Sequence, residues 1–295
     1  MRITEGTFAS GFLSTVNRSR ERIVKLQTQL ASGKLIQKPS DDPQAADTIL
    51  RLKESKNLRI QFQSNALEGE GMTDSTSSTL GQFGDLLMNL KEIVVKATGS
   101  GNNEDLTTYG GMVDQLLSEA VDVANTKFNG KFVLGGTQTQ SQPYTLAADR
   151  SAVSKNPAGI DGVIQYQVGE SSFIQANIGG EQALNGTDIF DLIVRVRDSM
   201  NNGTFTSVSV LDDVDKAVSH VLNSSSQAGS LANHFSAVQS NLEEQESQLD
   251  QYLSLTQDTD IAEATMNLKH EETMLDAALT TGGSIIPKSL LDFLR

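Results

Sequence analysis

The chain has 295 residues, enough for two or three domains, yet only 37% of them are apolar and 5% aromatic, with no tryptophan. Several globular cores normally contain more apolar residues, so we expect thin packing surfaces along long helices. The formal net charge of −14 and the lack of basic clusters exclude nucleic acid as a partner, and the lack of apolar runs near about 20 residues excludes membrane insertion.

A long helix is predicted at the start of the chain, ending at Gly33, which suits the left-handed position after a helix. Apolar residues recur along it in alternating steps of four and three. This spacing places them on one side of the helix, as in a coiled coil. The residues of this N-terminal seam are Phe12, Val16, Ser19, Ile23, Leu26 and Leu30.

A second helix is predicted after a polar connector, with Asp42 as its N-cap and Pro43 at its first helical position. It continues to a break at 99–103, which is rich in glycine and asparagine. A further helix with the same apolar rhythm follows from Leu106 to Val123. The best-marked part of the second helix contains Leu80, Phe83, Leu87, Leu90, Val94 and Ala97.

The pattern changes after Phe128, where period-two alternation and glycines replace the helical rhythm. A strand is predicted at 132–134. Alternating apolar residues at 164–168 and 174–178, on either side of a turn, predict a hairpin or small sheet. We therefore expect a compact β-rich insert over 131–185, followed by a short helix that is capped by Thr187 or Asp188.

The helical rhythm resumes at Leu211 and lasts nearly to the end of the chain, with a break near 256–259. Asp260 and Glu263 have the spacing of a capping box, so the last helix is predicted to start there. This helix carries a second narrow row of residues. The members of this C-terminal seam are Ile261, Ala264, Leu268, Glu271, Leu275 and Ala278, with Ile286 and Leu290 beyond.

These elements predict a mainly α fold, in which both chain ends form a long antiparallel helical bundle or coiled coil around a central β-rich insert. We expect three parts. They are a terminal-helix domain from 1–40 and 257–295, a helical bundle domain from 41–130 and 186–256, and the insert at 131–185.

A narrow seam cannot bury itself in an isolated helix, so each end of the chain needs a partner. Both the other end of the same chain and a second copy qualify. We favour packing between copies, because a helix break separates each end from the central part and each end is thin in apolar residues. The assembly interface is predicted to contain Phe12, Val16, Ile23, Leu26, Leu30, Ile261, Ala264, Leu268, Leu275, Ala278, Ile286 and Leu290.

The sequence predicts no catalytic, cofactor-binding or metal site. Its histidines, His220, His234 and His270, lack the spacing of metal ligands on a helix. It has no glycine-rich phosphate loop and no nucleophile elbow. Acidic pairs such as Asp41-Asp42 fit helix capping and solvation. We therefore expect a protein that is not an enzyme and has no cofactor.

Cysteine is absent, and the first residues lack the apolar core of a secretory signal peptide. Two interpretations are open on these grounds. The chain is either a cytosolic protein without thiols, or an exported protein that leaves the cell unfolded by a route other than general secretion.

Four segments of the helical parts stand out, in this order: 29–34 with 41–46, 87–98, 124–133 and 264–294. Together they resemble the bacterial flagellin superfamily, and the resemblance covers the helices on both sides of the insert. Within this superfamily, residues 38–43 and 132–139 are more similar to the hook-associated junction proteins than to flagellins.

The resemblance implies a structural subunit of the bacterial flagellum. The subunit is an adaptor at the hook–filament junction that self-assembles through its terminal helices and supports filament attachment. It further implies that the ends of a free monomer stay disordered until neighbouring copies surround them. The alternatives are a flagellin or minor filament subunit and, from another class, a cytosolic coiled-coil regulator or an enzyme with a disguised site.

The implied partners are other copies in a ring or helical array, a neighbouring hook-associated junction protein, flagellin, and a flagellar export chaperone that binds the C-terminal helix. Neither nucleic acid nor membrane insertion is implied. The implied location is extracellular, in the flagellum, after export by the flagellar type III route without a cleaved signal peptide.

Overall fold

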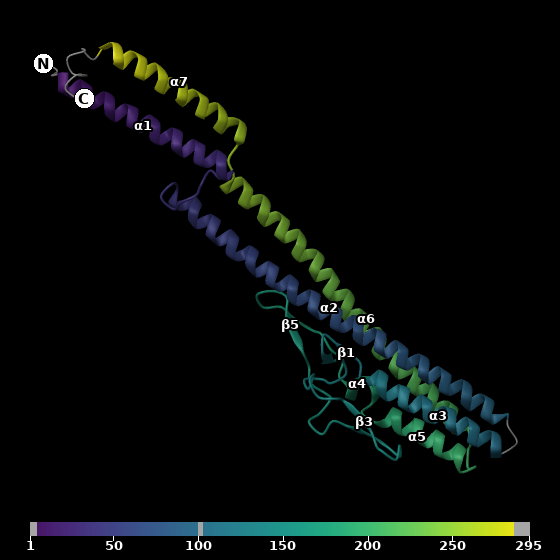
Figure 1. Ribbon diagram of the computed structural model, residues 1–295. Helices are drawn as coiled ribbons and strands as arrows, with labels where there is room; N and C mark the ends of the chain where they lie inside the picture. Colours follow the sequence, from purple (N-terminus) through teal and green to yellow (C-terminus); the bar gives the residue numbers. More distant parts are fainter. Residues whose placement is uncertain (1–4, 100–102, 286–295) are drawn as a thin grey trace. The chain divides into compact units, whose positions relative to one another are not determined.

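The computed structural model describes residues 5–99 and 103–285 (Figure 1). It confirms the mainly α fold with a small central β insert. The helices are α1 (Glu5–Ser32), α2 (Pro43–Thr98), α3 (Asn103–Ala124), α4 (Gly180–Leu184), α5 (Asp188–Asn201), α6 (Ser207–Gln257) and α7 (Ile261–Ile285). The strands are β1 (Lys127–Phe128), β2 (Lys131–Phe132), β3 (Tyr144–Leu146), β4 (Val153–Lys155), β5 (Gln165–Gln167) and β6 (Phe173–Gln175).

The chain forms two compact units. The terminal unit contains Met1–Leu58 and Glu246–Arg295, and the central unit contains Arg59–Gln245. The division into three parts that the sequence predicts stays a prediction.

The helix ends lie where the local signals predict them. Gly33 has a φ of +71°, and its N–H donates to the carbonyl of Gln29 at 2.8 Å. The Asp42 carboxylate accepts hydrogen bonds from the N–H groups of Gln44 and Ala45, both at 3.0 Å. These bonds satisfy backbone groups that a helix terminus leaves without partners, and so they fix where α1 ends and α2 begins.

Helices α2 and α6 run antiparallel through the central unit. At one end Lys91 pairs with Asp215 at 2.6 Å, and at the other the amide of Gln63 donates to Glu243 at 3.2 Å. Between these pairs the hydroxyls of Ser77 and Ser225 each donate to the carbonyl of the other residue, at 3.1 and 3.0 Å. Only small side chains allow backbone and hydroxyl groups of two helices to approach this closely.

The strands form three antiparallel hairpins, β1–β2, β3–β4 and β5–β6. The predicted hairpin at 164–178 is confirmed, with Tyr166 opposite Ile174. The predicted strand at 132–134 is wrong beyond its first residue. The strand is Lys131–Phe132, which pairs with β1 across Asn129 and Gly130, both at positive φ, and the next two residues are buried instead. An Asn-Gly turn of this kind closes a two-residue hairpin.

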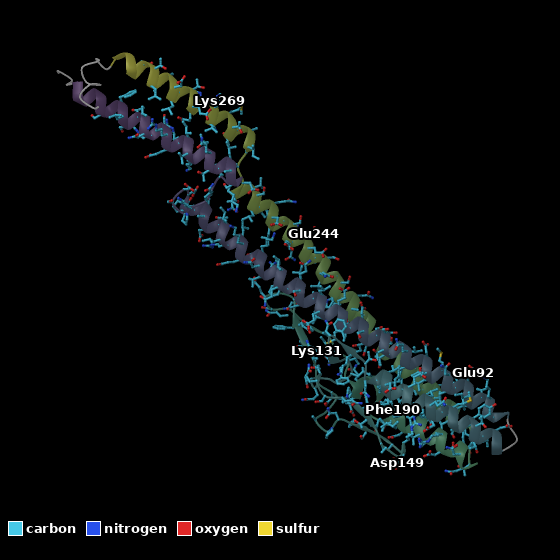
Figure 2. The ribbon with its side chains drawn as sticks, in the orientation of Figure 1. Glu92, Lys131, Asp149, Phe190, Glu244 and Lys269 are labelled. Atoms are coloured by element: carbon cyan, nitrogen blue, oxygen red, sulfur yellow. The ribbon has the colours of Figure 1, made fainter. Side chains whose placement is uncertain are left out.

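Most of the insert shares one buried core with the helices of the central unit, and the β5–β6 hairpin packs in a second cluster with Ala66 and Phe235. The ring of Phe190, from α5, meets the ring of Phe83 edge-on at 5.6 Å and that of Tyr144 at 4.9 Å. Figure 2 labels Phe190 among these crowded side chains. Burial raises the pKa of the Tyr144 hydroxyl far above its ordinary value. The β3–β4 hairpin is therefore anchored to the helices by its own first residue.

A buried arginine ties the same hairpin to two helices. The guanidinium of Arg197, in α5, donates to Asp114 at 3.1 Å and to the carbonyl of Arg150 at 2.6 Å. Arg150 lies in the β3–β4 turn and also pairs with Asp114, in α3. Because a buried charge is costly unless it is paired, each of these contacts holds the others in place.

Gly69→Ala is expected to destabilise the protein by about 1–3 kcal/mol, because the new Cβ would lie 2.5 Å from the buried Phe235 ring. Gly81→Ala, in the same helix, has nothing within 4 Å and is the matched control. It is expected to stabilise the protein by roughly 0.5–1 kcal/mol through helix propensity. Urea unfolding followed by circular dichroism measures both changes. Equal stabilisation by the two variants would contradict the close packing of α2 on α6.

Candidate assembly surface of the terminal helices

Helices α1 and α7, from the two ends of the chain, lie side by side and antiparallel in the terminal unit (Figure 1). The ring of Phe12 faces Gly282, so close that a Cβ at Gly282 would be 2.2 Å from it. Further along, Arg22 pairs with Glu271 at 2.8 Å. The carbonyl of Gly33 accepts from the N–H of Thr259 at 2.9 Å. Pairs near both ends and in the middle fix one register for the whole contact.

The N-terminal seam faces α7, because all of its members are buried or half-buried. Most of the C-terminal seam faces α1 in the same way. Ile261 differs, since 62% of its surface is exposed at the first position of α7. Ile286 and Leu290 lie outside the described residues. The inward members of the C-terminal seam are Ala264, Leu268, Glu271, Leu275 and Ala278.

The two seams therefore face each other within one chain. In this arrangement the other end of the same chain is the partner that each seam needs. The prediction that the seam residues make contacts between copies stays a prediction. Apart from Ile261, the residues that remain exposed on the terminal helices lie outside the seams, and Leu13 and Val24 of α1 are among them.

A polar group interrupts the apolar contact at its middle. The Arg22 guanidinium donates to both carboxylate oxygens of Glu271, at 2.8 and 3.1 Å, and to the Ser19 hydroxyl at 2.9 Å. Donation by Arg22 holds the pKa of Glu271 below its ordinary value. Ser19 and Glu271 both occupy seam positions. Such polar groups cost stability in a coiled coil but specify its register, because sliding the helices would separate them.

The connection between α6 and α7 is bonded directly to the end of α1. The N–H of Leu35 donates to the carbonyl of Gln257 at 2.7 Å. The backbones of Lys34 and Asp258 form an isolated antiparallel β-bridge. We call residues 33–35 and 252–263 the elbow. At its far side the Asp260 carboxylate accepts from the N–H of Ala262 at 2.8 Å and of Glu263 at 3.1 Å, as the capping pattern predicts.

The chain that leaves the elbow toward α2 is held by one carboxylate. Asp41 accepts from the N–H groups of Gln37 and Lys38 at 3.3 and 3.2 Å and pairs with Lys25 of α1 at 3.2 Å. These donors, led by the Gln37 N–H, lower the pKa of Asp41. The acidic pair at 41–42 thus serves as a turn anchor and a helix cap.

The groove between α1 and α7 contains a pocket of about 300 Å³. Two of its charged residues are paired with each other, and it contains no nucleophile beside a base. Among the described residues no group of three metal-ligating side chains occurs, and no helix there is long and apolar enough to cross a membrane. The pocket is lined by Arg22, Lys25, Leu26, Gln29, Asn267, His270 and Glu271.

Sequence reasoning missed three features of this surface. In the heptad pattern Arg22 falls outside the seam, at a position that normally faces solvent, so its ion pair with Glu271 is not predictable from the pattern. The Gly-Gly pair at 282–283 is typical of a turn, yet it lies inside α7, where Gly282 leaves room for the Phe12 ring. The backbone β-bridge between Lys34 and Asp258 joins residues that are far apart in the sequence, so no local sequence pattern marks it.

Comparison with known families decides what kind of chain carries this arrangement. A model of the bacterial flagellin N-terminal helical region matches residues 3–139, and a model of the bacterial flagellin C-terminal helical region matches residues 211–294. The chain belongs to the bacterial flagellin family. The two matches cover the helical parts of the chain on both sides of the insert, and they leave most of the insert of this family member unmatched.

Two curated relatives differ in their coverage. Flagellar hook-associated protein 3 of Salmonella typhimurium is 24% identical over 50% of this chain and 47% of its own length. The match thus spans about half the length of that relative. The flagellin of Bacillus subtilis is 22% identical, with 100% of both proteins covered.

A solved structure has the same fold. The structure of a flagellar hook-associated protein from Vibrio parahaemolyticus superposes with a TM-score of 0.65 at 18% identity. The superposition covers 74% of this chain and 99% of the other. At this identity the likeness concerns the fold alone.

Glu271→Gln is expected to make the α1–α7 contact less sensitive to acid. Because the folded-state pKa of Glu271 is lowered, its contribution is present above the unfolded value and is lost as the pH falls through the folded pKa. On acidification below about pH 5, amide exchange in residues 16–30 is expected to accelerate more in the wild type, by less than about tenfold, since exposed ion pairs are weak.

Glu272→Gln is the matched control, because Glu272 pairs only with Lys269 of its own helix, at 3.4 Å, among the described residues. Figure 2 labels Lys269 on α7. This control is expected to keep the acid sensitivity of the wild type. Identical pH profiles for Glu271→Gln and the wild type would show that the pair does not stabilise the contact.

Proposed function

We propose that this protein is a structural subunit of the bacterial flagellum that acts as an adaptor at the hook–filament junction. The adaptor assembles with further copies through its terminal helices and supports attachment of the filament. The observation that carries the proposal is the family match on both helical arms, combined with a fold like that of a hook-associated protein.

A second candidate is a flagellin or minor filament subunit. The end-to-end match with the Bacillus subtilis flagellin favours it. Both candidates share the same helical arms and differ in position along the flagellum. A junction adaptor occupies one point, whereas a filament subunit repeats along the whole length.

The proposed partners follow from this position. They are other copies of the chain in a ring or helical array, a neighbouring hook-associated junction protein on the hook side, and flagellin on the filament side. The proposed location is the flagellum, outside the cell. The proposed route is the flagellar type III channel, and a chain without cysteine supports this, because it cannot be trapped by disulfides while unfolded.

An export chaperone that binds the C-terminal helix is part of the proposal. Helix α7 supports this role, because Met266 and Met274 are exposed on it and flexible thioether side chains suit adaptable binding surfaces.

Immunolabelling of isolated flagella tests the position. The label is expected at one point, between hook and filament. Deletion of the gene is expected to leave hooks intact while flagellin monomers leak into the medium. Label along the filament, or rescue of a flagellin-deficient strain with long filaments, would favour the filament subunit and overturn the adaptor. A chain found only inside cells would exclude both.

Removal of residues 256–295 is expected to abolish binding to the export chaperone, because it deletes the whole of α7. Co-purification of the truncated and full-length chains from cells that express the chaperone measures this. The full-length Gly81→Ala variant, altered only in the central unit, is expected to bind like the wild type. Undiminished binding by the truncated chain would place the chaperone site elsewhere.

A further inference from the structure

Several large apolar side chains of the elbow are exposed to solvent over most of their surface. Leu255 is 83% exposed, the largest value among the exposed large apolar residues of the described chain, and Tyr252 and Ile261 are 60% and 62% exposed. Leu35, in the other segment of the elbow (33–35), is also exposed. These four exposed residues lie in one bonded element, which makes the elbow a candidate for an interaction site.

The elbow holds these side chains on a fixed backbone. Leu35 and Gln257 are joined by a 2.7 Å hydrogen bond, and Thr259 and Gly33 by one of 2.9 Å. The capping bonds of Asp260 then fix the start of α7. The patch is therefore a built surface and not the tip of a loose loop.

The elbow is acidic around its apolar residues. Asp258, Asp260 and Glu263 are exposed, against one exposed base, Lys34. The acids lie on both sides of Ile261 in the chain. A partner that covers this patch must therefore offer apolar side chains together with positive charge.

The outer side of α1 offers such a combination. Leu13 and Val24 are 57% and 59% exposed there, and Arg20 lies on the same side of the helix between them. Arg22 and Lys25 of α1 are already paired with Glu271 and Asp41. Arg20 makes no ion pair with any described residue, so its charge can meet an acidic group of a partner. Arg18 projects from a nearly opposite side of the helix and does not belong to this surface.

One chain cannot bring the two surfaces together. Arg20 and Gly33 lie 13 residues apart along α1 and its end, and a helix rises 1.5 Å per residue, so the separation is about 20 Å. Because α1 is continuous, it cannot fold back onto the elbow. The partner must come from another molecule.

We propose that the elbow of one copy docks on the outer side of α1 of the next copy, around Leu13, Arg20 and Val24. This inference rests on the proposed function and names the contact by which the copies associate. The contact joins two different surfaces, so each copy keeps one of each free for a further neighbour. Contacts of this kind build rings or helical arrays. The seams hold each molecule together, and the elbow joins one molecule to the next.

Photo-crosslinking in intact flagella tests the contact. A photo-reactive amino acid at position 255 is expected to give a crosslinked dimer, with residues 13–24 of the second copy identified by mass spectrometry. The same amino acid at Val163, which is more than half exposed on the insert, is the matched control and is expected to give no crosslink to α1. Crosslinks from position 255 to flagellin, to a different junction protein or to residues 286–295 of the same chain, or no crosslink at all, would overturn the inference.

Charge exchange tests the electrostatic part. Arg20→Glu and Asp258→Lys are each expected to lower the yield of the crosslinked dimer by about tenfold, because each places like charges across the contact. The double variant is expected to recover most of the yield. A double variant that forms no more dimer than either single variant, with helix content unchanged, would rule out this pairing. Immunolabel at one point together with such a result would reject the docking contact and leave the adaptor function in place.

Discussion

The narrow contact between α1 and α7 is the constraint on which the terminal unit depends. Each helix carries only enough apolar residues for one thin seam, and isolated helices of this kind are marginally stable in water. Facing each other, the two seams use up the inward residues of both chain ends. The surface that remains for neighbours is therefore the outer one, which contains Val24, Leu255 and Ile261.

The two units fix a single packing arrangement by different interactions. In the central unit, Phe83, Tyr144 and Phe190 interlock in a closed apolar core that includes the insert. In the terminal unit, Arg22 and Glu271 form a polar layer in an otherwise thin contact. The first arrangement favours stability. The second gives up some stability and gains a single register, which a subunit needs if its outer surface is to present the same pattern in every copy.

Local signals made most of the helical frame predictable from the sequence. Gly33, Asp42 and the pair Asp260 and Glu263 act within four residues of themselves, so their effect can be seen in the sequence. The seam periodicity likewise identified the inward side of α1. Ile261 differs from the other seam members, because it is exposed at the first position of α7, and its place in the assembly interface stays a prediction.

The remaining features depend on contacts between distant segments. Strands β3 and β4 are three residues each, too short to show a period, and they are held by Tyr144 in the core and by the Arg150–Asp114 pair. Arg197 has no sequence signature, since its burial depends on partners from two other segments. The same holds for the terminal unit. The sequence marks the seams and the helix ends that flank the elbow, whereas the backbone contacts that join the two segments of the elbow leave no local signal.

The pairing of Arg22 with Glu271 spans 249 positions, nearly the whole chain. Closing so large a loop costs conformational entropy before any contact between α1 and α7 repays it, so this pairing is expected to form late in folding. Until it forms, the N-terminal seam is open to contact with apolar surfaces of other molecules.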